Sequence, residues 1–263
     1  MENQTTDLPV PLPAVPISEL TPEIVALAAR YRRANGPVIA LVNRLGGSLE
    51  KQLAGVPDGL RSRIEGAAAI ALERAHDLAG HSRHAPSVGR NGPLAAIMAS
   101  GAAGGAAGLA GSLAELPVSV TLILHAIRRE AGAAGFDPDD PRVRAECLRV
   151  FGAGSPMAAD DGVNTAFLSA RLTLTGAAVQ RIIAAVAPRF GIAIGQKLAA
   201  QSVPVLGALT GAALNAAYLN WYREVAAIRF ALLRLAQTHG GENVALAFQQ
   251  ATEQALARPT RRS

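Results

Sequence analysis

The sequence predicts an all-α protein, a glycine- and alanine-rich helical bundle in which two long apolar helical segments are broken at Pro117 and Pro204. Half of the 263 residues are hydrophobic, yet only 4% are aromatic, and glycine occurs 26 times. Such small residues are typical of closely packed helices. The period-two runs of β-branched and aromatic residues that indicate strands are missing from the sequence. A chain of this length is sufficient for one domain with a buried core.

The first residues are expected to lie outside this bundle. Residues 7–22, DLPVPLPAVPISELTP, are rich in proline, which favours an extended, polyproline-like chain. We therefore expect residues 1–20 to form a flexible tail, with a proline motif that binds a partner as the alternative. Pro22 is suited to the first turn of a helix capped by Thr21, and a Gly-Pro pair ends that helix near Asn35.

The middle of the chain shows helices with clear start and stop signals. Residues 60–78 place apolar side chains on one stripe of a helix, and a basic loop follows over residues 80–93. After an apolar block at residues 94–127, Asp140 is a good N-cap and Pro141 a good first residue for a short helix that glycines end. The buried stripe of this short helix is expected to contain Val143, Cys147, Val150 and Phe151.

The second half is predicted to hold a long helix that begins at about Gly162, followed by two or three further helices. Breaks between them are expected near Pro188, Gly195 and Pro204. A last amphipathic helix covers residues 243–257. Residues 21–257 are therefore expected to form a single all-α domain, and residues 258–263 a basic, disordered tail.

Two uncharged runs are long enough to reach across a membrane, Leu94 to Ala114 and Leu198 to Tyr222. Three alternatives stay open for them: insertion into a membrane, peripheral or hairpin-type association, and a soluble bundle. Glycines spaced four residues apart let two helix backbones approach closely, in lipid or in a soluble core. The pairs with this spacing are Gly101 and Gly105, Gly104 and Gly108, and Gly207 and Gly211.

Glu115 and Pro117 interrupt the first apolar block. Ser112 and Glu115 fit the S-x-x-E capping box, which predicts that a new helix begins there and that Pro117 forces the restart. Alternatively, a carboxyl group in an apolar region needs a partner, which Arg189 or Lys197 would supply in a shared site. The candidate functional polar cluster consists of Glu115, Arg189, Lys197, Gln201 and Asn215.

No catalytic, cofactor or metal site is expected. Cys147 is the only cysteine, which excludes an intramolecular disulfide and fits a reducing compartment, and its apolar stripe predicts a buried structural thiol. His81 and His84 have HxxH spacing, but they lie in the basic loop, where neighbouring arginines disfavour a cation. The acidic DPDDP segment lacks the glycine of a calcium loop, and no P-loop or G-x-S-x-G motif occurs.

The net charge of +5 and the isoelectric point near 10.1 favour anionic partners, such as an acidic protein or the cytoplasmic leaflet of a membrane. Nucleic acid is not expected as a partner, because the sequence has no basic stripe interleaved with aromatic residues. The opening residues MENQTTDLPV lack the apolar segment of a secretory signal, so we expect a cytoplasmic location.

Several stretches together resemble the EcsC family of bacterial proteins, in their order and spacing as well as their content. They are SLAELPVSVTLILHAI at 112–127, FDPDDPRVRAECLRVFGAG at 136–154, APRFGIAIGQKLAAQSVPVLGALTGAALNAAY at 187–218 and IRFALLRL at 228–235. The likeness covers roughly residues 60–240, and Gly195 and Gln196 stand where the family has serine and glutamate. The matching positions are Glu115, Pro117, Asp140, Arg144, Arg189, Phe190, Gly191, Lys197, Gln201 and Pro204.

The resemblance implies a helical, membrane-associated accessory role, because the family is named for a protein encoded with an ABC transporter, and it implies no established catalytic chemistry. The first hypothesis is a non-enzymatic accessory protein of transport, secretion or envelope physiology, located in the cytoplasm at a membrane. Its partners would be anionic lipid and an ABC transporter or another membrane protein. The alternative is a soluble helical enzyme or small-ligand binder with a polar pocket at Glu115, Arg189 and Lys197. A protein-interaction scaffold that uses the proline-rich front is a second alternative.

Overall fold

The computed structural model describes residues 22–34, 66, 70, 92–152 and 204–257, and every secondary-structure element in these ranges is an α-helix. A first helix covers residues 22–34. The others are α4 (Gly92–Ala106), α5 (Gly108–Ala133), α6 (Pro141–Gly152), α8 (Pro204–His239) and α9 (Gly241–Ala257). The prediction of an all-α fold is confirmed over the described part of the chain.

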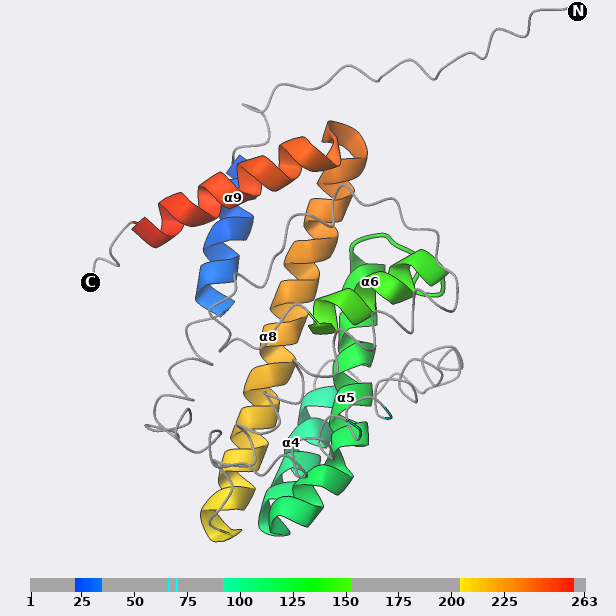
Figure 1. The fold of residues 1–263 in the computed structure, drawn as a ribbon, viewed down its shortest axis with the longest axis vertical. Helices are drawn as coiled ribbons and strands as arrows, with labels where there is room; N and C mark the ends of the chain where they lie inside the picture. The colour runs from blue at the N-terminus through cyan, green and yellow to red at the C-terminus, as the bar shows by residue number, and fades with distance from the viewer. Residues whose placement is uncertain (1–21, 35–65, 67–69, 71–91, 153–203, 258–263) are drawn as a thin grey trace, which may run out of the picture.

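The 36-residue helix α8 is the element against which the others pack (Figure 1). At a rise of 1.5 Å per residue it is roughly 54 Å long. The antiparallel helices α4 and α5 lie along its N-terminal half, and α6 contacts both α5 and α8. Helix α9 turns back across the C-terminal end of α8 and contacts the first helix through Tyr31 and Phe248.

The break that we expected at Pro117 is wrong, because Pro117 lies inside α5 and the interruption falls at Ala107. A proline within a helix costs about 3 kcal/mol, but its neighbours Leu116 and Val120 are buried, so tertiary packing holds the helix together. Ala107 instead lies within a run of glycines, each of which weakens a helix by about 1 kcal/mol.

The expected capping box is also wrong. Helix α5 begins at Gly108, its N-cap residue is Ala107, and no side chain caps it. Ser112 and Glu115 therefore lie within the helix rather than at its start. Position 111 must be glycine at this sharp turn, because an added Cβ would lie 2.3 Å from the Ala107 Cβ and 2.9 Å from the Gly104 carbonyl oxygen.

Helix α8 begins at Pro204, where the sequence indicated a boundary, and continues without interruption to His239. Gly240 joins α8 to α9 with a φ of 83°, a left-handed conformation that favours glycine. The last helix begins at Gly241, two residues before the expected start at Asn243. Helix boundaries differ by this much between assignment criteria, so the prediction of a last helix is confirmed.

The core lies between α5, α6, α8 and the first helix. Phe151 of α6 stacks on Tyr222 of α8 at a centroid distance of 5.1 Å, and the Tyr222 hydroxyl donates to the Phe151 carbonyl oxygen at 3.1 Å. Cys147 is buried, as predicted, and burial raises the pKa of its thiol to about 12. Cys147 is therefore a packed thiol rather than a reactive thiolate.

Several expectations lie outside the described residues. These are the two tails, the loop at 80–91, the long helix from Gly162, and the breaks at Pro188 and Gly195. Of the helix expected at 60–78, only Gly66 and Ile70 are described, and both are helical. In the described ranges, no helix combines the length and apolar character that a membrane span requires.

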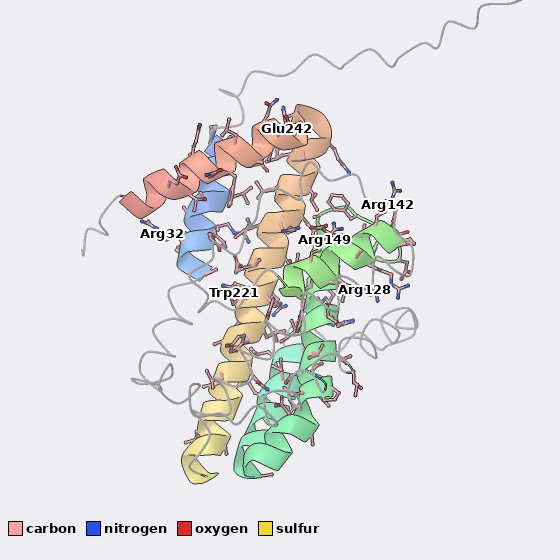
Figure 2. The ribbon with its side chains drawn as sticks, viewed as in Figure 1. Arg32, Arg128, Arg142, Arg149, Trp221 and Glu242 are labelled. Carbon is pink, nitrogen blue, oxygen red and sulfur yellow. The ribbon has the colours of Figure 1, made fainter. Side chains whose placement is uncertain are left out.

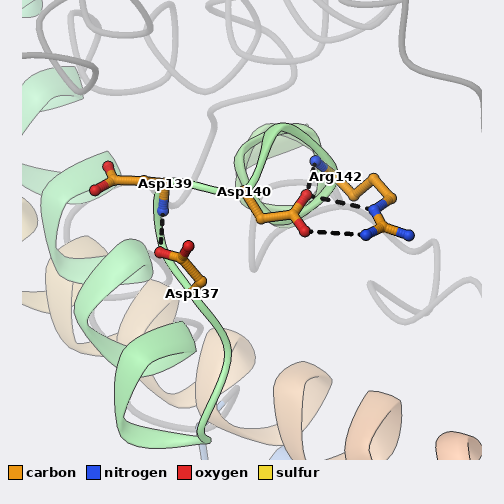
Figure 3. A network of polar contacts seen from close by, with 4 residues as sticks. All are labelled: Asp137, Asp139, Asp140 and Arg142. Carbon is orange, nitrogen blue, oxygen red and sulfur yellow. Dashed lines mark hydrogen bonds and ion pairs between the residues drawn. The ribbon is translucent and has the colours of Figure 1, made fainter.

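The start of α6 confirms the predicted cap at Asp140. The Arg142 backbone N–H donates to Asp140 Oδ1 at 2.7 Å, and the Arg142 guanidinium pairs with Asp140 Oδ2 at 3.2 Å (Figure 3). In the preceding turn, Asp137 Oδ1 accepts from the Asp139 N–H at 2.9 Å. The hydrogen bond from the Arg142 backbone is the main reason that the pKa of Asp140 lies below its ordinary value of 3.8.

The first prediction concerns this cap. Asp140→Ala should lower the free energy of unfolding by about 1 kcal/mol near neutral pH, because an orphan N–H of α6 loses its acceptor. Folding lowers the pKa of Asp140, so the ionised carboxylate adds its full contribution to the free energy of unfolding above pH 3.8. This contribution is lost as the pH falls through the lower pKa of Asp140 in the folded protein. Urea unfolding at several pH values measures the effect. Asp140→Asn is the control, because it keeps the cap without titrating. If Asp140→Ala lowers the free energy of unfolding by the same amount at acid pH as at neutral pH, Asp140 is not the cap described here.

Candidate functional site

Glu115 is buried where α4, α5 and α8 meet. It is the only Asp, Glu, Lys or Arg among residues 92–124 and 204–222, which form these three helices in that half of the molecule. A buried carboxyl group must find hydrogen-bond partners, because its desolvation is otherwise strongly unfavourable. The partners of Glu115 therefore decide how the three helices fit together.

One oxygen of Glu115 accepts hydrogen bonds from all three helices. Ser100 Oγ of α4 donates to Glu115 Oε1 at 3.1 Å, Ser119 Oγ of α5 donates to the same oxygen, and Asn215 Nδ2 of α8 donates to it at 2.7 Å. Asn215 Nδ2 also lies 3.0 Å from the Ile97 carbonyl oxygen and 3.1 Å from Ser119 Oγ. We call Ser100, Glu115, Ser119 and Asn215 the Glu115 cluster.

Glycines bring the helices close enough for this cluster to form. A Cβ on Gly101 would lie 2.4 Å from the Gly211 carbonyl oxygen and 2.6 Å from Asn215 Nδ2. A Cβ on Gly104 would lie 3.0 Å from the Glu115 Cβ. The close helix packing that the glycine spacing predicted is confirmed at Gly101, Gly104 and Gly211, and these contacts surround the carboxyl group.

The structure brings together two members of the predicted polar cluster, Glu115 and Asn215. Arg189, Lys197 and Gln201 lie outside the described residues, so their part in the cluster stays a prediction. Sequence reasoning missed Ser100 and Ser119. Ser119 carries a signal that would have found it, because a residue four positions after Glu115 lies on the same helix face.

A second buried charged group joins α6 to α8. Glu146 accepts from Arg229 through Oε1 and pairs with Arg149 Nη1 through Oε2 at 2.8 Å. Burial lowers the pKa of Arg229 to about 10, although the adjacent Glu146 opposes the shift. Two guanidinium groups thus share one carboxylate, and removing Glu146 would leave Arg229 buried without this partner.

Arg128 fixes the turn between α5 and α6. Its Nη2 donates to the Pro138 carbonyl oxygen at 3.1 Å and pairs with Asp139 Oδ1 at 2.7 Å. Three of the arginines labelled in Figure 2, Arg128, Arg142 and Arg149, lie around α6. In the same region, burial is the main cause that lowers the pKa of His125, and Arg129 and Arg128 lower it further. Charge is thus concentrated at this end of the helices.

These features define an all-helical protein in which three glycine-packed helices close around a buried carboxyl group. A family model described as the EcsC protein family matches residues 48–235, which include α4, α5, α6 and most of α8. The chain belongs to this family. The match agrees with the resemblance expected over residues 60–240 and leaves out the first helix and α9. Neither the search of curated proteins nor the search of solved structures finds a match.

The second prediction concerns the contact between α4 and α8. Gly101→Ala should lower the free energy of unfolding by about 3 kcal/mol, because the new methyl group would meet the Gly211 backbone and the Asn215 amide. Gly66→Ala is the matched control, since a Cβ there would meet nothing within 4 Å. In a helix this control should raise stability by up to about 1 kcal/mol. Equal effects of the two substitutions in thermal unfolding would contradict the close contact.

Proposed function

We propose that this EcsC family protein is a non-enzymatic accessory protein that associates with the cytoplasmic face of a membrane through one uncharged end of its helical body. The observation that supports this proposal is the separation of charge along the helices. We define the uncharged end as α4, residues 108–124 of α5 and residues 204–222 of α8. Its single charged residue, Glu115, is buried and hydrogen-bonded within the Glu115 cluster.

The charged end begins abruptly beyond these residues. In α5, charge begins at Arg128, and in α8 it begins at Arg223. Arg223 Nε lies 3.8 Å from Glu130 Oε1, so the boundary falls at the same level on both helices. In Figure 1, the parts of α4, α5 and α8 that make up the uncharged end lie in the lower half of the view. Such a separation suits a body with one end in lipid and the other in water.

Exposed apolar side chains on the uncharged end would provide the contact with lipid. Leu209, Val118 and Met98 are 72%, 49% and 40% exposed. Complete burial of such a side chain stabilises by about 1.5–3 kcal/mol, so the three together would supply only a few kcal/mol. We therefore expect reversible association, assisted by attraction between the net charge of +5 and anionic lipid.

The Glu115 cluster supports a structural role for its carboxyl group. Its Oε1 accepts from side chains of three helices, and Gly104 packs directly against the Glu115 side chain. These contacts use the carboxyl group to join helices. The proposed accessory role in transport or envelope physiology rests on the resemblance to the EcsC family, and the proposed partner is an ABC transporter or another membrane protein.

The third prediction tests association through the uncharged end. Leu209→Glu should reduce co-sedimentation with vesicles of phosphatidylcholine and phosphatidylglycerol by at least about tenfold, because a carboxylate resists entry into lipid. Leu209 is 72% exposed, so the substitution should leave the fold intact. Leu246→Glu is the matched control, since Leu246 is 54% exposed and lies on α9, away from the uncharged end.

Two results would overturn the proposal. In one, the wild-type protein stays in the supernatant when it is mixed with these vesicles. In the other, Leu209→Glu and Leu246→Glu sediment equally well. In cells, fractionation should recover the protein with membranes, and a carbonate wash should release it.

A further inference from the structure

A cavity of about 460 Å³ lies between the first helix and α8. Its volume falls within the range of small-molecule sites in proteins, roughly 300–1,000 Å³. Arg30 and Arg33 line it from the first helix, and Asn220, Trp221 and Glu224 line it from α8. Figure 2 shows Trp221 on α8 near the lower end of the first helix. The two helices thus place polar groups and an aromatic ring around one hollow.

The polar part of the cavity carries a net positive charge. Arg30 Nη2 lies 3.0 Å from Glu224 Oε2, so these two groups neutralise each other on one wall. Arg33 also lines the cavity, is exposed, and forms no ion pair among the described residues. A guanidinium group binds phosphate through two parallel hydrogen bonds, which makes Arg33 suited to a phosphate ester. Asn220 adds an amide that donates and accepts.

The remaining part of the cavity is apolar. Ala34 and Ala217 line it, together with Trp221, which is only 2% exposed. A ligand that fits both parts carries an anionic group on an apolar body.

The place of the cavity along α8 is the second observation. Residues 217–222 are the last of the uncharged end, and Arg223 and Glu224 begin the charged end. The cavity therefore lies where the uncharged end stops and the charged end begins.

We propose that this cavity binds the headgroup of one anionic phospholipid, with Arg33 on the phosphate, Asn220 beside it, and the glycerol against Ala34 and Ala217. This inference rests on the proposed membrane association and adds to it a specific lipid site. One wall of the site comes from the first helix, which lies outside residues 48–235 matched by the family model. The site is therefore a property of this chain in addition to its EcsC domain.

Trp221 reports on the site directly, because it is the only tryptophan of the chain. The full-length protein is titrated with a short-chain phosphatidylglycerol, below the concentration at which that lipid forms micelles, while tryptophan fluorescence is recorded. The fluorescence should change saturably, and the same lipid brominated near the glycerol should quench it. Arg33→Ala should weaken this binding by about tenfold, because one charge-assisted contact to phosphate is lost.

Two controls make the result specific. Arg129→Ala removes the same charge from an exposed position on α5 that does not line the cavity, and it should bind the short-chain lipid as the wild type does. Inorganic phosphate, tested alone, distinguishes a lipid site from a site for the free anion. It should change the fluorescence only at much higher concentration, because it lacks the apolar body.

The outcomes separate this inference from the proposed function. If the protein sediments with anionic vesicles but the short-chain lipid leaves Trp221 unchanged, the headgroup site is wrong and the membrane association stands. Equal binding by Arg33→Ala and Arg129→Ala would also overturn the site, as would inorganic phosphate that binds as tightly as the lipid. If the short-chain lipid binds and Arg33→Ala weakens it, but no vesicle is bound, the cavity site stands and the proposed association fails.

Discussion

The carboxyl group of Glu115 is the constraint on which the arrangement of α4, α5 and α8 depends. A buried acid among the otherwise uncharged residues 92–124 and 204–222 requires donors, and Ser100, Ser119 and Asn215 supply one from each helix. These short side chains reach Glu115 only if the helix backbones approach closely. Glycine at positions 101 and 104 permits that approach, because a Cβ on residue 101 would collide with Asn215 and one on residue 104 would crowd Glu115.

The buried position of Glu115 also keeps its charge away from the surface of the uncharged end. Charge reappears beyond it, where Arg223 and Glu130 pair between α8 and α5 and where Glu146 holds Arg229 and Arg149. Among the described residues, charge is thus concentrated toward one end of α5 and α8, and the cavity beside Trp221 lies at the boundary. The proposed membrane association and the proposed lipid site both rest on this separation.

Local signals predicted the start of α6 at Asp140 and Pro141 and the burial of Cys147, because a cap and a helical stripe are set by nearby residues. The break at Pro117 was a wrong prediction, since its cost is offset by packing that involves residues far away in the chain. The sequence predicted that Glu115 needs a partner and named Arg189 or Lys197 for it, with Asn215 only a member of the same cluster. Ser100 became a partner through the turn at Ala107. A short sequence pattern cannot report such a contact, which depends on how three helices cross.

A double-mutant cycle on Glu115 and Asn215 tests this account most directly. Glu115→Ala, Asn215→Ala and the double variant are unfolded in urea, and the free energies of unfolding are compared with that of the wild type. Each single substitution should cost about 2–3 kcal/mol, because it leaves buried polar partners unsatisfied. The double variant should cost at least about 1 kcal/mol less than the sum, since the two residues share one hydrogen-bonded group. Additive costs would contradict the claim that their interaction joins α5 to α8.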